Sequence, residues 1–201
     1  MSNVNTSRNL GVWFPEVIAT YFNVNHADYE TDIVKKCYDI KNNNKENGGK
    51  EWVSNVYNTW GVTDVSIDKT FKSITEFTQK CVEEYVDQLG MKLKGKIYNP
   101  KLAESWFNTY DKGDFQEYHL HESIISTIYF VSCDKNDSRT IFKSNRYEAY
   151  PITYETDYRP SGRVSYDAVP GKLLVFRSHL EHCVEQKTTD NPRITIASNF
   201  I

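Results

Sequence analysis

Residues 106–129, WFNTYDKGDFQEYHLHESIISTIY, combine β-rich runs, a turn and two closely spaced histidines. β-Rich runs stand on both sides of the turn-forming residues 111–114, DKGD, which predicts strands joined by a tight turn. The second run carries His119 and His121. Side chains two positions apart on a strand share one face, so both imidazoles can meet one metal ion.

A third histidine and an arginine follow downstream. His182 lies in FRSHLEHCVEQ, residues 176–186, and Arg193 opens the strand-like run RITIASNFI. Two close ligands, one distant ligand and a cation suggest an iron oxygenase. Non-heme Fe(II) takes three ligands on one side and keeps open positions for a co-substrate and oxygen. A buried arginine can hold a co-substrate carboxylate through two parallel hydrogen bonds.

The flanking segments predict a mainly β domain with helices at its N-terminal end. Apolar residues recur at helical spacing near 27–40 and again over 68–89, where Asp68 is expected to cap a helix and Gly90 to stop it. The apolar face of this second helix is expected to pack on a sheet. Beyond residue 92, many short β-rich runs favour a jelly roll. Strands are expected within 92–98, 103–110, 115–121, 123–131, 139–143, 162–168, 172–178, 182–186 and 193–200.

Length and composition limit the possible classes. The 201 residues fit one catalytic domain, with 1–91 as a helical support region and 92–201 as the jelly-roll core. The net charge is −3 with both signs mixed, so nucleic acid is not expected as a partner. The four cysteines are scattered, as expected for reduced thiols. No leader and no long apolar run is evident, so we expect a soluble, cytoplasmic protein without a membrane partner.

The ordered motifs resemble a known family. The chain looks like a 2-oxoglutarate- and Fe(II)-dependent dioxygenase, closest to the short "putative 2OG-Fe(II) oxygenase" family of phages and marine bacteria. The matching pieces are Trp106 and Asn108, Gly113, His119 and His121, Ser126 to Phe130, Gly171 to Phe176, His182 to Val184, and Arg193 to Thr195. Tyr110, Gly113 and His119 also resemble the approach to the metal in prolyl 4-hydroxylases. Most of the superfamily has Asp or Glu where this chain has His121.

This resemblance implies a double-stranded β-helix, with the N-terminal helices packed on one sheet, that binds Fe(II), 2-oxoglutarate and O2. The metal ligands would be His119, His121 and His182, with Glu122 as the reserve carboxylate ligand. The co-substrate would contact Arg193, Thr195, Asn108, Tyr110 and Ser126. The implied reaction hydroxylates a C–H bond of a small-molecule or peptidyl substrate and forms succinate and CO2. The protein is either cellular or phage-encoded, and a phage-encoded protein would act in the host cytoplasm. The oligomeric state is open, and a dimer is possible.

Alternative interpretations remain for the fold and for single residues. A three-histidine, cupin-like metalloenzyme would not need 2-oxoglutarate, and a jelly-roll binding module would have no catalysis. His179 is the competitor of His182, but lacks the following Cys-Val. His26 is expected at the surface, and Trp106 in the core. The tyrosine-rich loop between Ser144 and Gly162 is either a lid over the substrate or a solvent loop.

Overall fold

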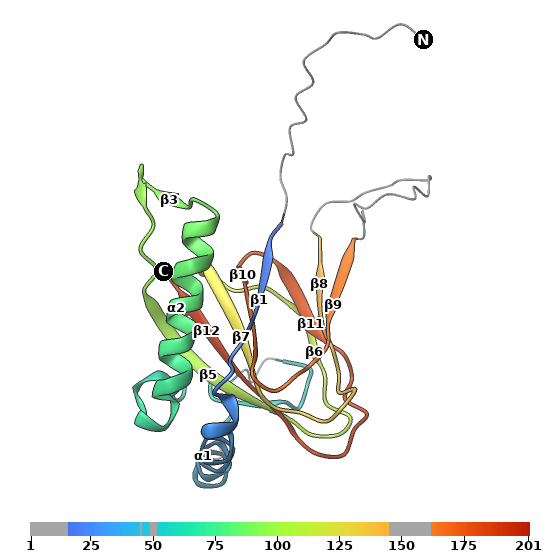
Figure 1. The fold of residues 1–201 in the computed structure, drawn as a ribbon. Helices are drawn as coiled ribbons and strands as arrows, with labels where there is room; N and C mark the ends of the chain where they lie inside the picture. Colours follow the sequence, from blue (N-terminus) through green and yellow to red (C-terminus); the bar gives the residue numbers. More distant parts are fainter. Residues whose placement is uncertain (1–15, 45, 49–51, 145–161) are drawn as a thin grey trace, which may run out of the picture.

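A larger and a smaller antiparallel sheet face each other, and two helices cover the outer face of the larger one (Figure 1). The computed structural model describes residues 16–44, 46–48, 52–144 and 162–201. The loop 144–162, interpreted from the sequence as either a lid or a solvent loop, therefore lies almost wholly outside the described residues. The described arrangement is the predicted one: mainly β, with helices packed on one sheet.

The larger sheet has the strand order β1-β10-β7-β12-β5-β2. Its strands are β1 (Ile18–Phe22), β10 (Lys172–Arg177), β7 (Ile125–Ser132), β12 (Arg193–Phe200), β5 (Leu102–Tyr110) and β2 (Tyr57–Asn58). Alternate residues face opposite sides. On β7, Tyr129 and Val131 pack with the helices, whereas Ile128 and Phe130 pack toward the smaller sheet. Both faces of this sheet are therefore buried.

The smaller sheet has the order β6-β11-β8-β9. Its strands are β6 (Gln116–His119), β11 (Glu181–Val184), β8 (Thr140–Lys143) and β9 (Arg163–Tyr166). Two further strands, β3 (Lys92–Leu93) and β4 (Lys96–Ile97), form a separate hairpin. The turns after β5 and before β10 contain Gly113 and Gly171 with φ of 95° and 79°, a conformation that glycine adopts without strain. These turns join the two sheets at the positions that the sequence predicts.

Two α-helices pack on the outer face of the larger sheet. The first, α1 (Glu30–Asn43), buries Ile33 and Cys37, and the second, α2 (Lys72–Gln88), contacts β10 and β7. Short 3₁₀ turns precede them: η1 (His26–Asp28), η2 (Val65–Ile67) and η3 (Lys69–Phe71). The Asp68 side chain caps η3, which leads directly into α2, and Gly90 follows the helix with φ 59°. Asp68 thus caps the helical segment as predicted, but the first turn of that segment is 3₁₀ and α2 begins only at Lys72.

The N-terminal region contributes more to the sheet than its sequence predicts. Both β1 and β2 come from residues before 92 and form the two edges of the larger sheet. His26, expected at the surface, is buried at 7% exposure, and its Nδ1 lies 2.9 Å from the Tyr129 hydroxyl. The prediction for His26 was wrong because the turn that carries it packs against β7 and the Gly171 turn. None of the helices among the described residues is long and apolar enough to cross a membrane.

Candidate metal centre and co-substrate pocket

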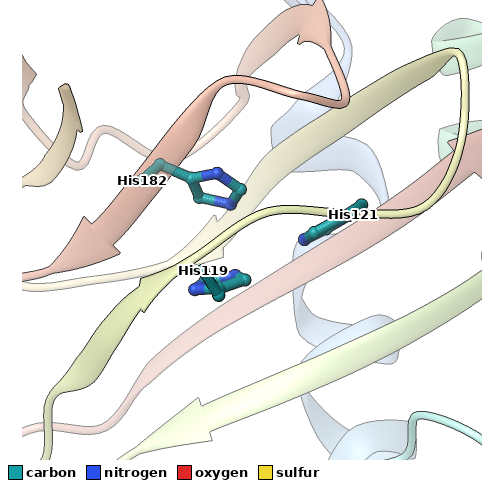
Figure 2. Close-up of side chains that lie close together, drawn as sticks. All are labelled: His119, His121 and His182. Atoms are coloured by element: carbon teal, nitrogen blue, oxygen red, sulfur yellow. The ribbon is translucent and has the colours of Figure 1, made fainter. Parts of the chain in front are cut away.

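Three histidines converge between the two sheets. His119 ends β6 and is the cross-strand neighbour of His182 on β11, while His121 lies just beyond the strand end. One nitrogen from each of the three side chains lies within 4.8 Å of the others. Figure 2 shows the three imidazoles facing a common space. His121 was expected inside the strand; its backbone N–H instead donates to the Ser178 carbonyl at 3.0 Å, which carries the chain toward the larger sheet.

Backbone carbonyls orient two of the imidazoles. The Nδ1 of His119 lies 2.8 Å from the Glu117 carbonyl oxygen, and the Nδ1 of His182 lies 2.9 Å from that of Leu180. A carbonyl oxygen only accepts hydrogen bonds, so each Nδ1 carries the proton. The lone pair of each ring is then on Nε2, the arrangement usual for metal-binding histidine.

A side-chain relay orients the third imidazole. The Nδ1 of His121 lies 2.8 Å from Asn199 Oδ1, and the Asn199 amide nitrogen donates to Glu104 at 2.7 Å. The Glu104 carboxylate only accepts, so it fixes which way the Asn199 amide points. Ser126 also donates to Asn199 Oδ1, at 2.8 Å. His121 therefore has its Nε2 lone pair available, as do His119 and His182.

Burial keeps these rings neutral. Desolvation lowers the pKa of His121 to about 4, with the Asn199 contact opposing the shift and the charge of His119 adding to it. Desolvation also lowers the pKa of His119, and it places the pKa of His182 well below its ordinary value. Neutral imidazole is the form that binds metal, so this cluster needs no proton release at neutral pH.

Arg193 is a buried cation at the other end of the same space. It is 1% exposed and lies between the rings of Tyr110 and Phe130, with its guanidinium carbon 4.9 Å and 5.2 Å from the two ring centres. Its amino groups donate to Ser138 at 3.4 Å and Thr140 at 3.0 Å, and its Nε has no partner. Burial lowers the pKa of Arg193, but a guanidinium keeps its charge in proteins.

The nearest buried carboxylate does not neutralise Arg193. Asp137 forms an ion pair with Lys187 at 3.0 Å, and both side chains are fully buried. Asp137 also accepts from the backbone N–H and hydroxyl of Ser138. Within the described part of the chain, Arg193 forms no ion pair of its own. A buried charge without a counter-charge is costly, so the arrangement indicates an anionic ligand.

A cavity of about 520 Å³ connects Arg193 with the histidines. The register of β12 with β5 stacks its floor in layers: Arg193 beside Tyr110, Thr195 beside Asn108, Ala197 beside Trp106 and Asn199 beside Glu104. Asn108 donates to Thr195 at 3.4 Å, and its buried Oδ1 has no partner. The Tyr110 hydroxyl donates to Gln116 at 2.7 Å. Polar groups thus line the path from the cation to the imidazoles.

Most of the predicted site residues gather in this cavity. It is lined by His119, His121, His182, Arg193, Thr195, Asn108, Tyr110 and also Glu122. Ser126 lies beside it, within 3.1 Å of His121. Glu122 is exposed and is not part of the histidine cluster, and His179 pairs with Glu16 away from it. Trp106 is 6% exposed as expected, but it also lines the cavity.

Four residues of the site were not among the residues predicted for it. Glu104 and Asn199 lie at the outer ends of β5 and β12, and Trp52 and Trp60 come from the segment before β5. Glu104 and Asn199 share the inward alternation of the predicted residues on their strands, so the period of two would have found them. No comparable pattern marks Trp52 and Trp60, because loop positions follow no period.

Residues 104–199 match the family described as "Putative 2OG-Fe(II) oxygenase". Several solved structures resemble the whole fold. A prolyl 4-hydroxylase from Pseudomonas putida has a TM-score of 0.63 at 13% identity, covering 92% of each chain. A prolyl hydroxylase from Trichoplax adhaerens, solved with a hypoxia inducible factor peptide fragment, has a TM-score of 0.61 at 12% identity, covering 92% of this chain and 83% of that one.

A third solved structure was determined with ligands. HygX from Streptomyces hygroscopicus, with nickel, 2-oxoglutarate and hygromycin B, has a TM-score of 0.60 at 10% identity, covering 92% of this chain and 82% of that one. No curated protein matches the sequence. At these identities the structures establish the fold, which confirms the predicted double-stranded β-helix. With this fold and the family match over its catalytic core, the chain is a 2-oxoglutarate- and Fe(II)-dependent oxygenase.

Proposed function

We propose that His119, His121 and His182 hold the Fe(II), and that Arg193 anchors 2-oxoglutarate for the hydroxylation of a substrate C–H bond. One observation carries this assignment. A single cavity is lined at one end by three converging imidazoles and at the other by a buried arginine without a counter-charge. The two ends match the metal and the distal carboxylate of a bound 2-oxo diacid.

The histidine cluster fits Fe(II) by its donor atoms. Three neutral nitrogens on one side of a metal leave positions open for two ligand atoms of a co-substrate and for O2. The usual carboxylate ligand is replaced by His121, which Asn199 connects to the Glu104 carboxylate. Such outer partners hold a ligand in orientation and raise its basicity.

The arginine end fits a dicarboxylate. The unpartnered Nε and the amino groups of Arg193 can form charge-assisted hydrogen bonds to one carboxylate, and the Thr195 hydroxyl lies one layer closer to the histidines. One amide atom of Asn108 faces the cavity without a partner, whichever way the amide is assigned. Tyr110 holds the guanidinium by its ring, and Ser126 supports the relay to His121.

The reaction follows from these two ends. When bound, iron and 2-oxoglutarate activate O2, so that one oxygen atom enters succinate as CO2 leaves and the other enters the substrate. The chain supplies orientation: the three imidazoles fix the metal, and Arg193 fixes the far end of the co-substrate. The buried side chains of Ile128 and Ala197 also line the cavity and make part of its wall apolar. An apolar wall limits the access of water.

The substrate class and the compartment are also proposals. The relatives of this fold were solved with a peptide fragment and with hygromycin B, and we propose a small-molecule or peptidyl substrate here as well. All four cysteines are free and none is paired in a disulfide. Reduced cysteines are typical of intracellular proteins, so we propose a cytoplasmic enzyme.

An anaerobic Fe(II) titration, with and without 2-oxoglutarate, tests this function. We expect stoichiometric iron binding and a charge-transfer absorption band that develops only when both are present. His121→Ala should lose iron binding, whereas Glu122→Ala should keep most of it. The reverse result would make Glu122 the third ligand. Iron binding without any effect of 2-oxoglutarate would favour a three-histidine, cupin-like enzyme. If both variants bind iron like the wild type, the metal site lies elsewhere.

A further inference from the structure

Five aromatic rings form a closed circuit at the outer end of the cavity. Going round, the ring centres are separated by 6.2 Å from His119 to Trp52, 6.4 Å to Trp60, 6.5 Å to Trp106, 5.4 Å to His121 and 5.3 Å back to His119. All five side chains line the same cavity. A group near the middle of such a circuit lies within about 6 Å of several ring centres, the range of cation–π attraction.

Backbone hydrogen bonds anchor the segments that carry the two loop tryptophans, and ring contacts position the Trp60 side chain. The backbone N–H of Val53, next to Trp52, donates to Glu117 at 2.9 Å. The backbone N–H of Trp60 donates to Asn58 Oδ1 at 3.0 Å, and the Asn58 side chain is fully buried. Trp60 nevertheless remains 44% exposed. A large aromatic side chain that is fixed in place and still exposed indicates a binding surface.

The charges on this end of the cavity are negative. Glu104 and Glu122 line it, and Glu104 engages Asn199 through only one carboxylate oxygen. Arg193 is the only lysine or arginine among the described residues that line the cavity. It lies six residues from Asn199 along β12, roughly 20 Å away at the rise of a strand. The charged side chains of the cavity are therefore basic at its inner end and acidic at its aromatic outer end.

We propose that this aromatic circuit is the substrate subsite and that it binds an alkylammonium group. The proposal rests on the proposed function for the metal-facing side, because His119 and His121 belong to both. Tryptophan faces attract a cation most strongly, and the two carboxylates favour the same sign of charge. A neutral sugar could stack on the tryptophans and donate hydrogen bonds to the two carboxylates, but it would gain no charge attraction from them.

The geometry also limits where the substrate reacts. Two of the five rings are the proposed metal ligands, so an ammonium group inside the circuit lies next to the metal. Iron held by His119 and His121 would then act on carbon atoms near the cationic nitrogen. A substrate with its ammonium group at one end and a long tail would point the tail outward, past the exposed Leu120.

Choline and its neutral isostere 3,3-dimethylbutan-1-ol test the proposal, because they have the same shape and differ in charge. Each is titrated anaerobically into protein loaded with Fe(II) and 2-oxoglutarate, and binding is followed by indole fluorescence. We expect choline to bind at least about tenfold more tightly, which corresponds to about 1.4 kcal/mol. Glucose serves as the neutral polyol. Equal binding of choline and the isostere, or tighter binding of glucose, would overturn the proposal.

Variants locate the binding. Trp60→Ala should reduce the preference for choline to within about twofold, and Glu122→Gln should weaken choline binding by a few-fold and reduce its salt dependence. Ile67→Ala and Glu76→Gln, which change an exposed side chain away from the cavity, are the matched controls. Choline binding that is unchanged in Trp60→Ala places it elsewhere. The charge-transfer band of the same samples reports the metal and co-substrate site independently, so failure of either proposal is distinguishable.

Discussion

Single residues of this chain have roles that depend on what their polar atoms contact. His182 and His179 are three residues apart, yet His182 is 2% exposed in the histidine cluster and His179 pairs with Glu16 outside it. The difference is one of strand geometry. His182 lies within β11 and directly opposite His119, whereas His179 precedes that strand.

His182→Ala should therefore abolish stoichiometric Fe(II) binding while the protein stays folded. One of three nitrogen ligands is lost, and the two remaining imidazoles do not hold the metal tightly. Equilibrium dialysis with iron measures the change, and circular dichroism checks the fold. His179→Ala is the matched control and should bind iron like the wild type. Wild-type affinity in His182→Ala would place the metal elsewhere.

Arg193 is the residue on which the co-substrate depends. Arg193→Ala should weaken 2-oxoglutarate binding by about thirty- to a hundred-and-fifty-fold, because a charge-assisted, two-fold hydrogen bond in a dry pocket contributes about 2–3 kcal/mol. Iron affinity should hardly change. Calorimetric titration of 2-oxoglutarate into the iron-loaded variant measures this. Arg177→Ala, at the exposed end of β10, is the control, and a similar loss there would contradict the assignment.

At the level of elements, one acidic residue, Asp68, connects the two helices. Asp68 caps η3 by accepting from Thr70 at 2.9 Å, and it also pairs with Lys36 of α1 at 2.8 Å. The hydrogen bond from Lys36, followed by that from Thr70, lowers the pKa of Asp68 to about 2. Asp68 thus connects the start of α2 to α1, both of which cover the larger sheet.

Asp68→Ala should destabilise the protein by about 1 kcal/mol at neutral pH, as expected for the loss of a cap. Because folding lowers the pKa of this carboxyl, its contribution is complete above its ordinary pKa of 3.8 and is lost as the pH falls toward about 2. Urea unfolding of wild type and variant at several pH values measures the difference. Glu76→Gln, in an exposed pair with Lys72, is the control and should change stability much less. A difference that persists unchanged at low pH would contradict the prediction.

For the whole molecule, ligand binding should be visible as stability, because the cavity lies between the two sheets. In protein loaded with a divalent metal under anaerobic conditions, 2-oxoglutarate at a hundred times its Kd should add about 2.7 kcal/mol to the free energy of unfolding. For a chain of this size, that raises the Tm by roughly 5–10 °C. Scanning calorimetry measures the shift. Arg193→Ala should show little of it at the same concentration, and an equal shift in that variant would show that the ligand binds elsewhere.

Periodicity was sufficient to predict much of this protein from its sequence. The period of two puts Asn108 and Tyr110 on one face of β5, and Arg193 and Thr195 on one face of β12. The family resemblance implied that all four contact the co-substrate, and the structure places them in one cavity. The helical stripe near 68–89 predicted a helix on a sheet, and α2 is found there. The family resemblance supplied the chemistry, and residues 104–199 match that family.

Contacts between distant segments could not be predicted in this way. Short N-terminal runs become strands β1 and β2 because the sheet edges at β10 and β5 offer them hydrogen-bond partners. His26 is buried because its turn packs against β7.

The β-rich architecture, the helices and the histidine–arginine set could be predicted from the amino-acid sequence, because they follow from local periodicity and ordered motifs. The contacts that complete the site depend on tertiary packing. The relay from Glu104 through Asn199 to His121, the pairing of Asp137 with Lys187 that leaves Arg193 uncompensated, and the aromatic circuit with Trp52 and Trp60 each join residues far apart in the chain. Such contacts depend on how sheets and loops pack in three dimensions, and no local pattern encodes them.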